Sequence, residues 1–146
     1  MMSKINVQVS GKSKGMQSVL NAGNHTITID EPPNMGGQDS GADPLSTLLS
    51  SLAGCENVIA NLVAKEINFD LKGIDFDIVG VLDPRGLMGD ETVKPYFEKV
   101  TINAKVDTSE SQERIDELQG KVDKRCPVYT TLEAAGIELV PNWTKA

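Results

Sequence analysis

One segment decides the fold of this chain, and it reads Asp43-Pro44-Leu45-Ser46-Thr47-Leu48-Leu49-Ser50-Ser51-Leu52-Ala53-Gly54-Cys55-Glu56-Asn57-Val58-Ile59-Ala60-Asn61-Leu62-Val63. Its apolar residues recur at the spacing of one helix face, at positions 45, 48, 49, 52, 55, 59, 62 and 63. Asp43 suits the N-cap, and Pro44 suits the first helical position. No charge occurs between Asp43 and Glu56. A surface helix normally carries charged residues, so we expect this helix to be covered on most sides.

The remaining segments predict an α+β fold in a single domain, residues 1–146. Alternating apolar residues predict strands, and amphipathic or capped stretches predict helices. The opening strands form an antiparallel meander, with a turn at Gly11–Gly15, and the fourth and fifth strands pair across a long loop, 83–97. The strands are expected at 4–9, 16–20, 25–30, 71–82, 98–106 and 137–140. The later helices are expected at 109–124, capped by Ser109, and from Pro127 to just before Gly136.

Composition limits the partners and cofactors of the protein. The net charge of −7 argues against binding to nucleic acid or to anionic membranes. No apolar stretch reaches 18 residues, and the N-terminus has no apolar signal-peptide core, so we expect a cytoplasmic protein without a membrane span. Two cysteines and one histidine are too few for a usual zinc site, so we expect neither a metal nor another cofactor.

The two cysteines are the candidates for chemistry. Cys126 lies just before a predicted helix, beside Arg125 and near Lys124, and both the helix dipole and the cations favour a thiolate there. Cys55 lies on an apolar helix face, where burial raises a thiol pKa. A structural disulfide is unusual in a reducing cytoplasm. Each cysteine is therefore either a redox group or a small packing residue.

These residues resemble the OsmC/Ohr family, named for osmotically inducible protein C and organic hydroperoxide resistance. The resemblance is carried by Asp43-Pro44, the run from Leu48 to Cys55, the loop from Leu82 to Gly89, and Arg125-Cys126-Pro127. It implies an OsmC-like α+β fold built as an intertwined homodimer, in which a buried helix from each subunit lies at the centre. The two active sites would lie at the subunit interface.

The resemblance also implies a reaction. The cysteine on the central helix, Cys55 here, would attack the peroxide O–O bond of a small organic hydroperoxide and become a sulfenic acid. Cys126 would then condense with it to a disulfide, which an external dithiol would reduce. Members of the family that act as peroxidases carry a glutamate one turn into the central helix and an arginine in the N-terminal segment. The matching helix positions here are Leu45 and Ser46, and the N-terminal segment has no arginine.

Three other residues are possible supporting groups, and three functions stay open. Arg85 or Arg125, from the same or the partner subunit, can replace the missing arginine, and Arg85 can equally be an ordinary ion-pair residue. Glu56 can orient a thiol, or it can lie in solvent or in an ion pair. The first function is a two-cysteine peroxidase that reduces organic hydroperoxides. The second is a non-catalytic protein that binds an apolar small molecule on the same dimeric scaffold. The third is a structural dimer whose thiols are inert.

Overall fold

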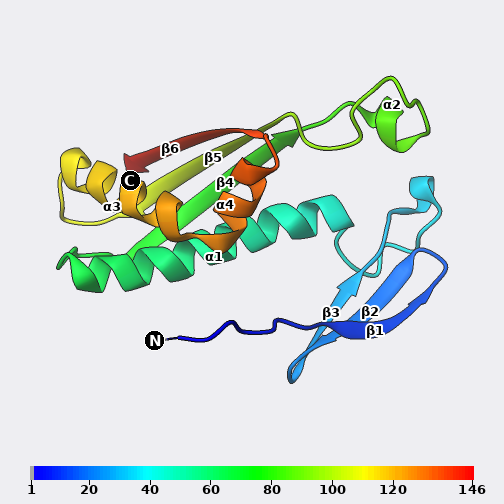
Figure 1. The fold of residues 1–146 in the computed structure, drawn as a ribbon, viewed down its shortest axis with the longest axis horizontal. Helices are drawn as coiled ribbons and strands as arrows, with labels where there is room; N and C mark the ends of the chain where they lie inside the picture. Colours follow the sequence, from blue (N-terminus) through cyan, green and yellow to red (C-terminus); the bar gives the residue numbers. More distant parts are fainter. Residues whose placement is uncertain (1) are drawn as a thin grey trace. The chain divides into compact units, whose positions relative to one another are not determined.

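The computed structural model describes residues 2–146 and divides the chain into two compact units, residues 1–48 and 49–146. Helix α1 (Pro44–Glu66) begins in the first unit and continues through the second. The element order is three strands, the long helix, two strands, two helices and a strand, apart from two short helical turns (Figure 1). The predicted α+β class and order of elements are therefore confirmed.

The first unit contains a three-stranded antiparallel meander of β1 (Ser10–Lys14), β2 (Gln17–Ala22) and β3 (His25–Ile29). Two-residue turns join the strands, and the first residue of each turn is a glycine with positive φ, Gly15 and Gly23. That position is the one at which a type II′ hairpin needs glycine. A 3-10 turn, η1 (Pro33–Met35), follows in the loop that leads to α1.

The predicted first strand, residues 4–9, is wrong. No strand in the described chain includes these residues, and their apolar side chains Ile5 and Val7 are 84% and 89% exposed. The first strand lies instead at Ser10–Lys14, where a turn was expected. The whole of β1 is exposed, so it carries no apolar alternation from which it could be identified. Gly15 and Met16 suffice for the turn, so the strand continues as far as Lys14.

A buried carboxylate organises the loop after β3. Asp30 is buried, and its oxygens accept hydrogen bonds from the backbone N–H groups of Glu31, Gln38 and Ser40 and from the Ser40 hydroxyl. These bonds, led by that from the Ser40 hydroxyl, lower the pKa of Asp30 to about 2. Because the bonds favour the ionised form, they hold the loop together only while Asp30 is charged.

We expect the variant Asp30→Asn to lower the free energy of unfolding near neutral pH and to lose this effect in acid. The folded-state pKa lies below the unfolded value of 3.8, so the contribution is present above that value and disappears as the pH falls through about 2. Urea unfolding of both proteins across this range measures the difference. Asp39→Asn, at an exposed residue of the same loop, is the control. A difference of the same size at both ends of the range would contradict the account.

Helix α1 starts as the sequence predicts. The Asp43 carboxylate accepts a hydrogen bond from the Ser46 N–H at 3.0 Å, and Pro44 is the first helical residue. The buried face of α1 is shifted from the predicted face and contains Leu52, Glu56, Ala60, Val63 and Ala64. The apolar sector is broader than one face, and Val58 and Leu62 on it are 58% and 47% exposed. By length and mean hydropathy α1 could also cross a membrane, as core helices of soluble proteins often could.

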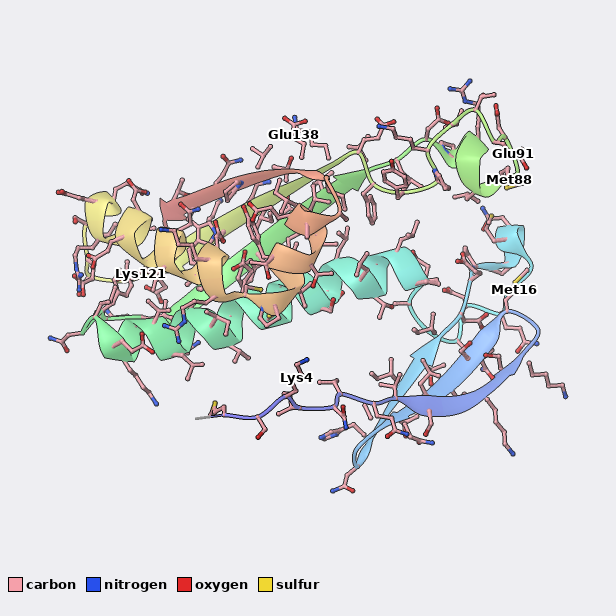
Figure 2. The ribbon with its side chains drawn as sticks, in the orientation of Figure 1. Lys4, Met16, Met88, Glu91, Lys121 and Glu138 are labelled. Carbon is pink, nitrogen blue, oxygen red and sulfur yellow. The ribbon has the colours of Figure 1, made fainter. Side chains whose placement is uncertain are left out.

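The second unit contains a three-stranded sheet covered by helices. Strand β4 (Gly73–Val81) pairs antiparallel with β5 (Lys99–Asp107), as expected, and β5 pairs in parallel with β6 (Glu138–Lys145). Alternate residues of β5, namely Val100, Ile102, Ala104 and Val106, are buried on one face. Helices α1, α3 (Gln112–Arg125) and α4 (Pro127–Ala134) pack against this face, and their side chains fill the space between (Figures 1 and 2).

Two boundaries in this unit differ from the prediction. The cap of α3 is Ser111, whose hydroxyl oxygen accepts from the Arg114 N–H, whereas the hydroxyl of Ser109 donates to Asp70 at 2.7 Å. Strand β6 continues past Pro141 to Lys145. Proline is tolerated there because β6 pairs only with β5, which leaves it an edge strand. The predicted long loop contains one short helical turn, α2 (Pro84–Leu87).

Candidate functional site

The two cysteines belong to one apolar cluster between the helices and the sheet. Cys55 lies near the middle of α1 and is half-buried. Cys126 is fully buried and lies between α3 and α4. Around them the cluster contains Leu52, Phe97, Val100, Ile102, Tyr129 and Leu132. The structure therefore brings together two thiols that are 71 residues apart in the sequence, and both are free.

Local sequence determines the position of Cys126. Pro127 disfavours helical geometry at the residue before it, and Cys126 has extended backbone angles that end α3. The same residue is the N-cap of α4, with Pro127 in the first turn, as predicted. Its Sγ accepts a hydrogen bond from the Tyr129 N–H at 3.4 Å, and its own N–H donates to the Val122 carbonyl. The sulfur is thus held at the start of a helix.

The prediction that Cys126 favours the thiolate is wrong for the described chain. Burial raises the pKa of Cys126 well above its ordinary value, and the neighbouring Cys55 thiol and the Glu56 carboxyl raise it further. The Tyr129 N–H lowers it, as expected at a helix N-terminus, but by less than burial raises it. Desolvation dominates because the sulfur has no exposed surface. Cys126 is consequently a protonated thiol at neutral pH.

Two carboxyl groups lie beside the thiols. Glu56 is fully buried, and within the described chain neither of its carboxyl oxygens has a hydrogen-bonding partner of good geometry. It is close enough to Asp123 on α3 for the two carboxyls to interact. Asp123 accepts a hydrogen bond from the Gln119 amide at 2.5 Å, and its other oxygen is unpaired. Burial is the main cause that raises the pKa of both groups, and the Asp123 charge raises that of Glu56 further.

Tyr129 adds a neutral phenol to this surrounding. Burial, and then the negative charges of Asp123, Glu133 and Glu56, raise the pKa of Tyr129 to about 12. The side chains that surround the sulfurs are therefore apolar, protonated or acidic. This differs from the cationic surrounding that the sequence suggested for Cys126.

The two candidate arginines are engaged elsewhere in the described chain. Arg125 forms two hydrogen bonds with Glu66, at 2.6 and 3.1 Å. Glu66 ends α1 eleven residues after Cys55, which is about 16 Å along the helix axis at about 1.5 Å per residue. Arg85 is exposed and pairs with Asp83 at the start of α2. Whether Arg85 reaches the cysteines of a second subunit stays a prediction.

Sequence reasoning missed Asp123 and Tyr129. Asp123 lies three residues before Cys126, which places the two on the same side of α3. That spacing was visible in the sequence, but the burial of an aspartate was not. Among residues 2–146, no group of three His, Cys, Asp or Glu side chains is arranged to hold a metal ion.

Comparison with known proteins agrees with the fold. Residues 37–141 match the model of the family described as OsmC-like protein. Proteins named hydroperoxide reductase from Mycoplasma pneumoniae and Mycoplasma genitalium are 29% and 31% identical to this chain over 109 and 111 residues. The alignments cover 73% and 75% of this chain and 72% and 73% of those proteins. The crystal structure of an OsmC like protein from Mycoplasma pneumoniae matches with a TM-score of 0.81 at 22% identity, covering 100% of this chain and 99% of that one.

Proposed function

Because this chain belongs to the OsmC-like protein family, we propose that it is a thiol-dependent peroxidase that reduces small organic hydroperoxides through Cys55 and Cys126. The observation that carries the proposal is that both thiols lie in one buried cluster. Membership of the family and the relatives named hydroperoxide reductase support a redox role. The family match runs from the first compact unit into the second, which supports a single OsmC-like domain.

In the first step Cys55 attacks one oxygen of the hydroperoxide. The S–O bond forms, the O–O bond breaks and the alkoxide leaves as an alcohol after protonation, so the thiolate is oxidised to a sulfenic acid. Cys55 suits this step better than Cys126 because it is half-buried, whereas Cys126 is fully buried and protonated. The apolar side chains around Cys55 favour an organic peroxide over hydrogen peroxide.

In the second step Cys126 attacks the sulfenic sulfur. The S–S bond forms, the S–O bond breaks and the hydroxide leaves as water. An external dithiol then reduces the disulfide by thiol–disulfide exchange and restores both thiols. We propose a cytoplasmic location for this cycle, because reductants that keep thiols reduced are available there.

Single-cysteine variants treated with cumene hydroperoxide test which thiol is attacked first. We expect Cys126→Ser to accumulate one sulfenic acid per chain at Cys55, because no second thiol is left to condense with it. Trapping with dimedone followed by peptide mass spectrometry measures the product. If Cys55→Ser instead forms the sulfenic acid and Cys126→Ser forms none, the attacking thiol is Cys126 and our assignment is reversed.

A second function, binding of an apolar small molecule without turnover, is favoured by one observation. Arg125 and Arg85 are paired with Glu66 and Asp83, so neither is free to activate Cys55 within the described chain. If neither wild-type thiol is oxidised faster than free cysteine, the peroxidase proposal fails and the binding function replaces it.

We also propose that the protein is a homodimer that covers the exposed part of the α1 apolar sector. Val58 and Leu62 are separated by one helical turn and are about half exposed, so a second copy could bury them. In an intertwined dimer, long segments of one subunit tend to cover its neighbour, so we expect the partner's Lys12, Lys14 and loop 83–97 to lie near Cys55. The positive charges of the two lysines, and of Arg85 in the loop, could then favour the thiolate form of Cys55.

We expect sedimentation to give twice the chain mass of 15.7 kDa at low micromolar concentration. The double variant Val58→Asp, Leu62→Asp should dissociate, because charges on both side chains would be buried without partners. The substitution Lys121→Asp, at an exposed residue of α3, changes the net charge by the same amount, −2, and is the control. A stable, folded monomer of the wild-type protein would contradict this prediction.

A further inference from the structure

The residues around the thiols form two facing pairs. Cys55 and Glu56 are neighbours on α1, and Asp123 and Cys126 are one turn apart at the end of α3. The Cys55 thiol lies near the Cys126 thiol, and the Glu56 carboxyl lies near the Asp123 carboxyl. Both contacts form together because each thiol is fixed to the same helix as its neighbouring carboxyl. The Glu56 carboxyl is in turn near enough to Cys126 to act on its ionisation.

Packing alone does not explain Glu56. A fully buried carboxyl group whose neighbour is a second acidic group is costly, and native proteins rarely contain one. Replacement of such a group by an apolar residue of similar volume is often neutral or stabilising. The helix positions around it, Leu52, Ile59 and Ala60, are apolar. A carboxyl in this place therefore suggests a chemical task.

The second step of the proposed reaction contains such a task. Cys126 is a buried thiol that must lose its proton to attack, and the hydroxide that leaves Cys55 must gain one. Bulk water does not reach Cys126, which has no exposed surface. A nearby pair of carboxyls that together hold one proton can accept the first proton and donate the second.

We propose that Glu56 and Asp123 form a proton-transfer pair that serves the condensation of Cys126 with the oxidised Cys55. The proposal rests on the proposed peroxidase function. As Cys126 attacks, its proton passes to the ionised carboxyl of the pair, and the proton of the other carboxyl passes to the departing hydroxide. The S–S bond forms, the S–O bond breaks and water leaves. Cys126 is oxidised, the sulfenic sulfur is reduced, and the pair still holds one proton.

Two residues outside the pair act on Asp123: Gln119 on α3 donates a hydrogen bond to it, and the Glu133 charge on α4 raises its pKa. The pair in turn acts on its neighbours, because Glu56 raises the pKa of Cys126, and both carboxyls raise that of Tyr129. The β5 residues in the same cluster, Val100 and Ile102, are apolar. All the titratable groups that act on the carboxyls are acidic or neutral, so nothing described opposes the sharing of one proton between them.

The test measures the two steps separately in single turnovers. We expect Glu56→Gln to leave sulfenic acid formation within about twofold of wild type and to slow disulfide formation about 10²- to 10⁴-fold, the usual contribution of general acid–base catalysis. The glutamine has the same shape but cannot titrate, so the pH dependence of the second step should flatten. Glu56→Asp should restore part of the rate. Glu138→Gln, at an exposed residue at the start of β6, is the matched control and should behave as wild type.

A chromogenic aromatic disulfide keeps the proposal testable if peroxide fails to react. It forms a mixed disulfide with Cys55, and attack by Cys126 then releases the second aromatic thiolate at a rate that absorbance follows. This step also requires Cys126 to lose its proton, so Glu56→Gln should slow it and flatten its pH profile. Failure of peroxide to oxidise either thiol of the wild-type protein, with no sulfenic acid in Cys126→Ser, would refute the peroxidase function alone. Wild-type rates and pH profile for Glu56→Gln, in a variant whose melting curve shows it folded, would overturn the proton-transfer pair.

Discussion

We expect peroxide turnover by the variant Cys55→Ser to fall to the rate of buffer and reductant alone, a loss of at least about a thousandfold, because a covalent nucleophile is removed. Serine has nearly the same size, but its hydroxyl cannot supply the thiolate that attacks the O–O bond. Consumption of cumene hydroperoxide with an excess of dithiothreitol measures the effect.

Cys126→Ser is the matched control for this variant. It keeps Cys55 and should still consume about one equivalent of peroxide before turnover depends on direct reduction of the sulfenic acid by the dithiol. Steady turnover by Cys55→Ser at more than about a tenth of the wild-type rate would show that the reaction does not depend on this thiol, because a nucleophile contributes far more than that.

The substitution Leu52→Ala has the largest expected effect on stability. Leu52 is fully buried on α1 and belongs to the cluster that holds Cys126 and Tyr129. Removal of its side chain leaves a cavity, and we expect a loss of about 2–5 kcal/mol in the free energy of unfolding. Because the cavity opens one turn from Cys55, disulfide formation should slow as well. Urea unfolding with the thiols reduced gives the stability.

Met88→Ala is the control, because Met88 is exposed in the loop that follows α2. A change within about 0.5 kcal/mol is expected there. If Leu52→Ala lowered the free energy of unfolding by no more than Met88→Ala does, Leu52 would not be packed as the structure describes.

Features that depend on neighbouring residues could be predicted from the sequence. The start of α1 at Asp43 and Pro44, and the helix start at Cys126 and Pro127, follow from local capping and from the geometry of proline. The antiparallel pairing of β4 and β5 follows from alternating apolar residues. The exposed strand β1 has no such pattern, and a glycine- and serine-rich sequence suggested a turn.

The surroundings of the thiols depend on tertiary packing and could not be predicted in this way. Arg125 is adjacent to Cys126 in the sequence, but its side chain pairs with Glu66, 59 residues away. Glu56 is a charged residue type, which usually lies at the surface, and its burial depends on how α3 packs against α1. The pKa of Cys126 likewise depends on desolvation, which its sequence neighbours do not determine.

The acidic surroundings also define what the proposed dimer must supply. Among residues 2–146 each arginine pairs with a carboxylate other than Glu56, and the immediate sequence neighbour of Cys55 is a carboxyl. If the dimer brings the partner's Lys12, Lys14 or Arg85 to Cys55, dissociation should slow sulfenic acid formation. The attack of Cys126 on the oxidised Cys55 should keep its rate, because both cysteines belong to the same chain. The dissociating double variant at Val58 and Leu62 separates these two effects.

Titration of the reduced protein with cumene hydroperoxide, followed by peptide mapping without reduction, tests the two-cysteine mechanism most directly. We predict that one equivalent of peroxide converts each chain to a form with an intramolecular disulfide between Cys55 and Cys126, and that dithiothreitol restores both thiols. Protein that consumes no peroxide, or that is oxidised without a Cys55–Cys126 bond, would contradict the mechanism.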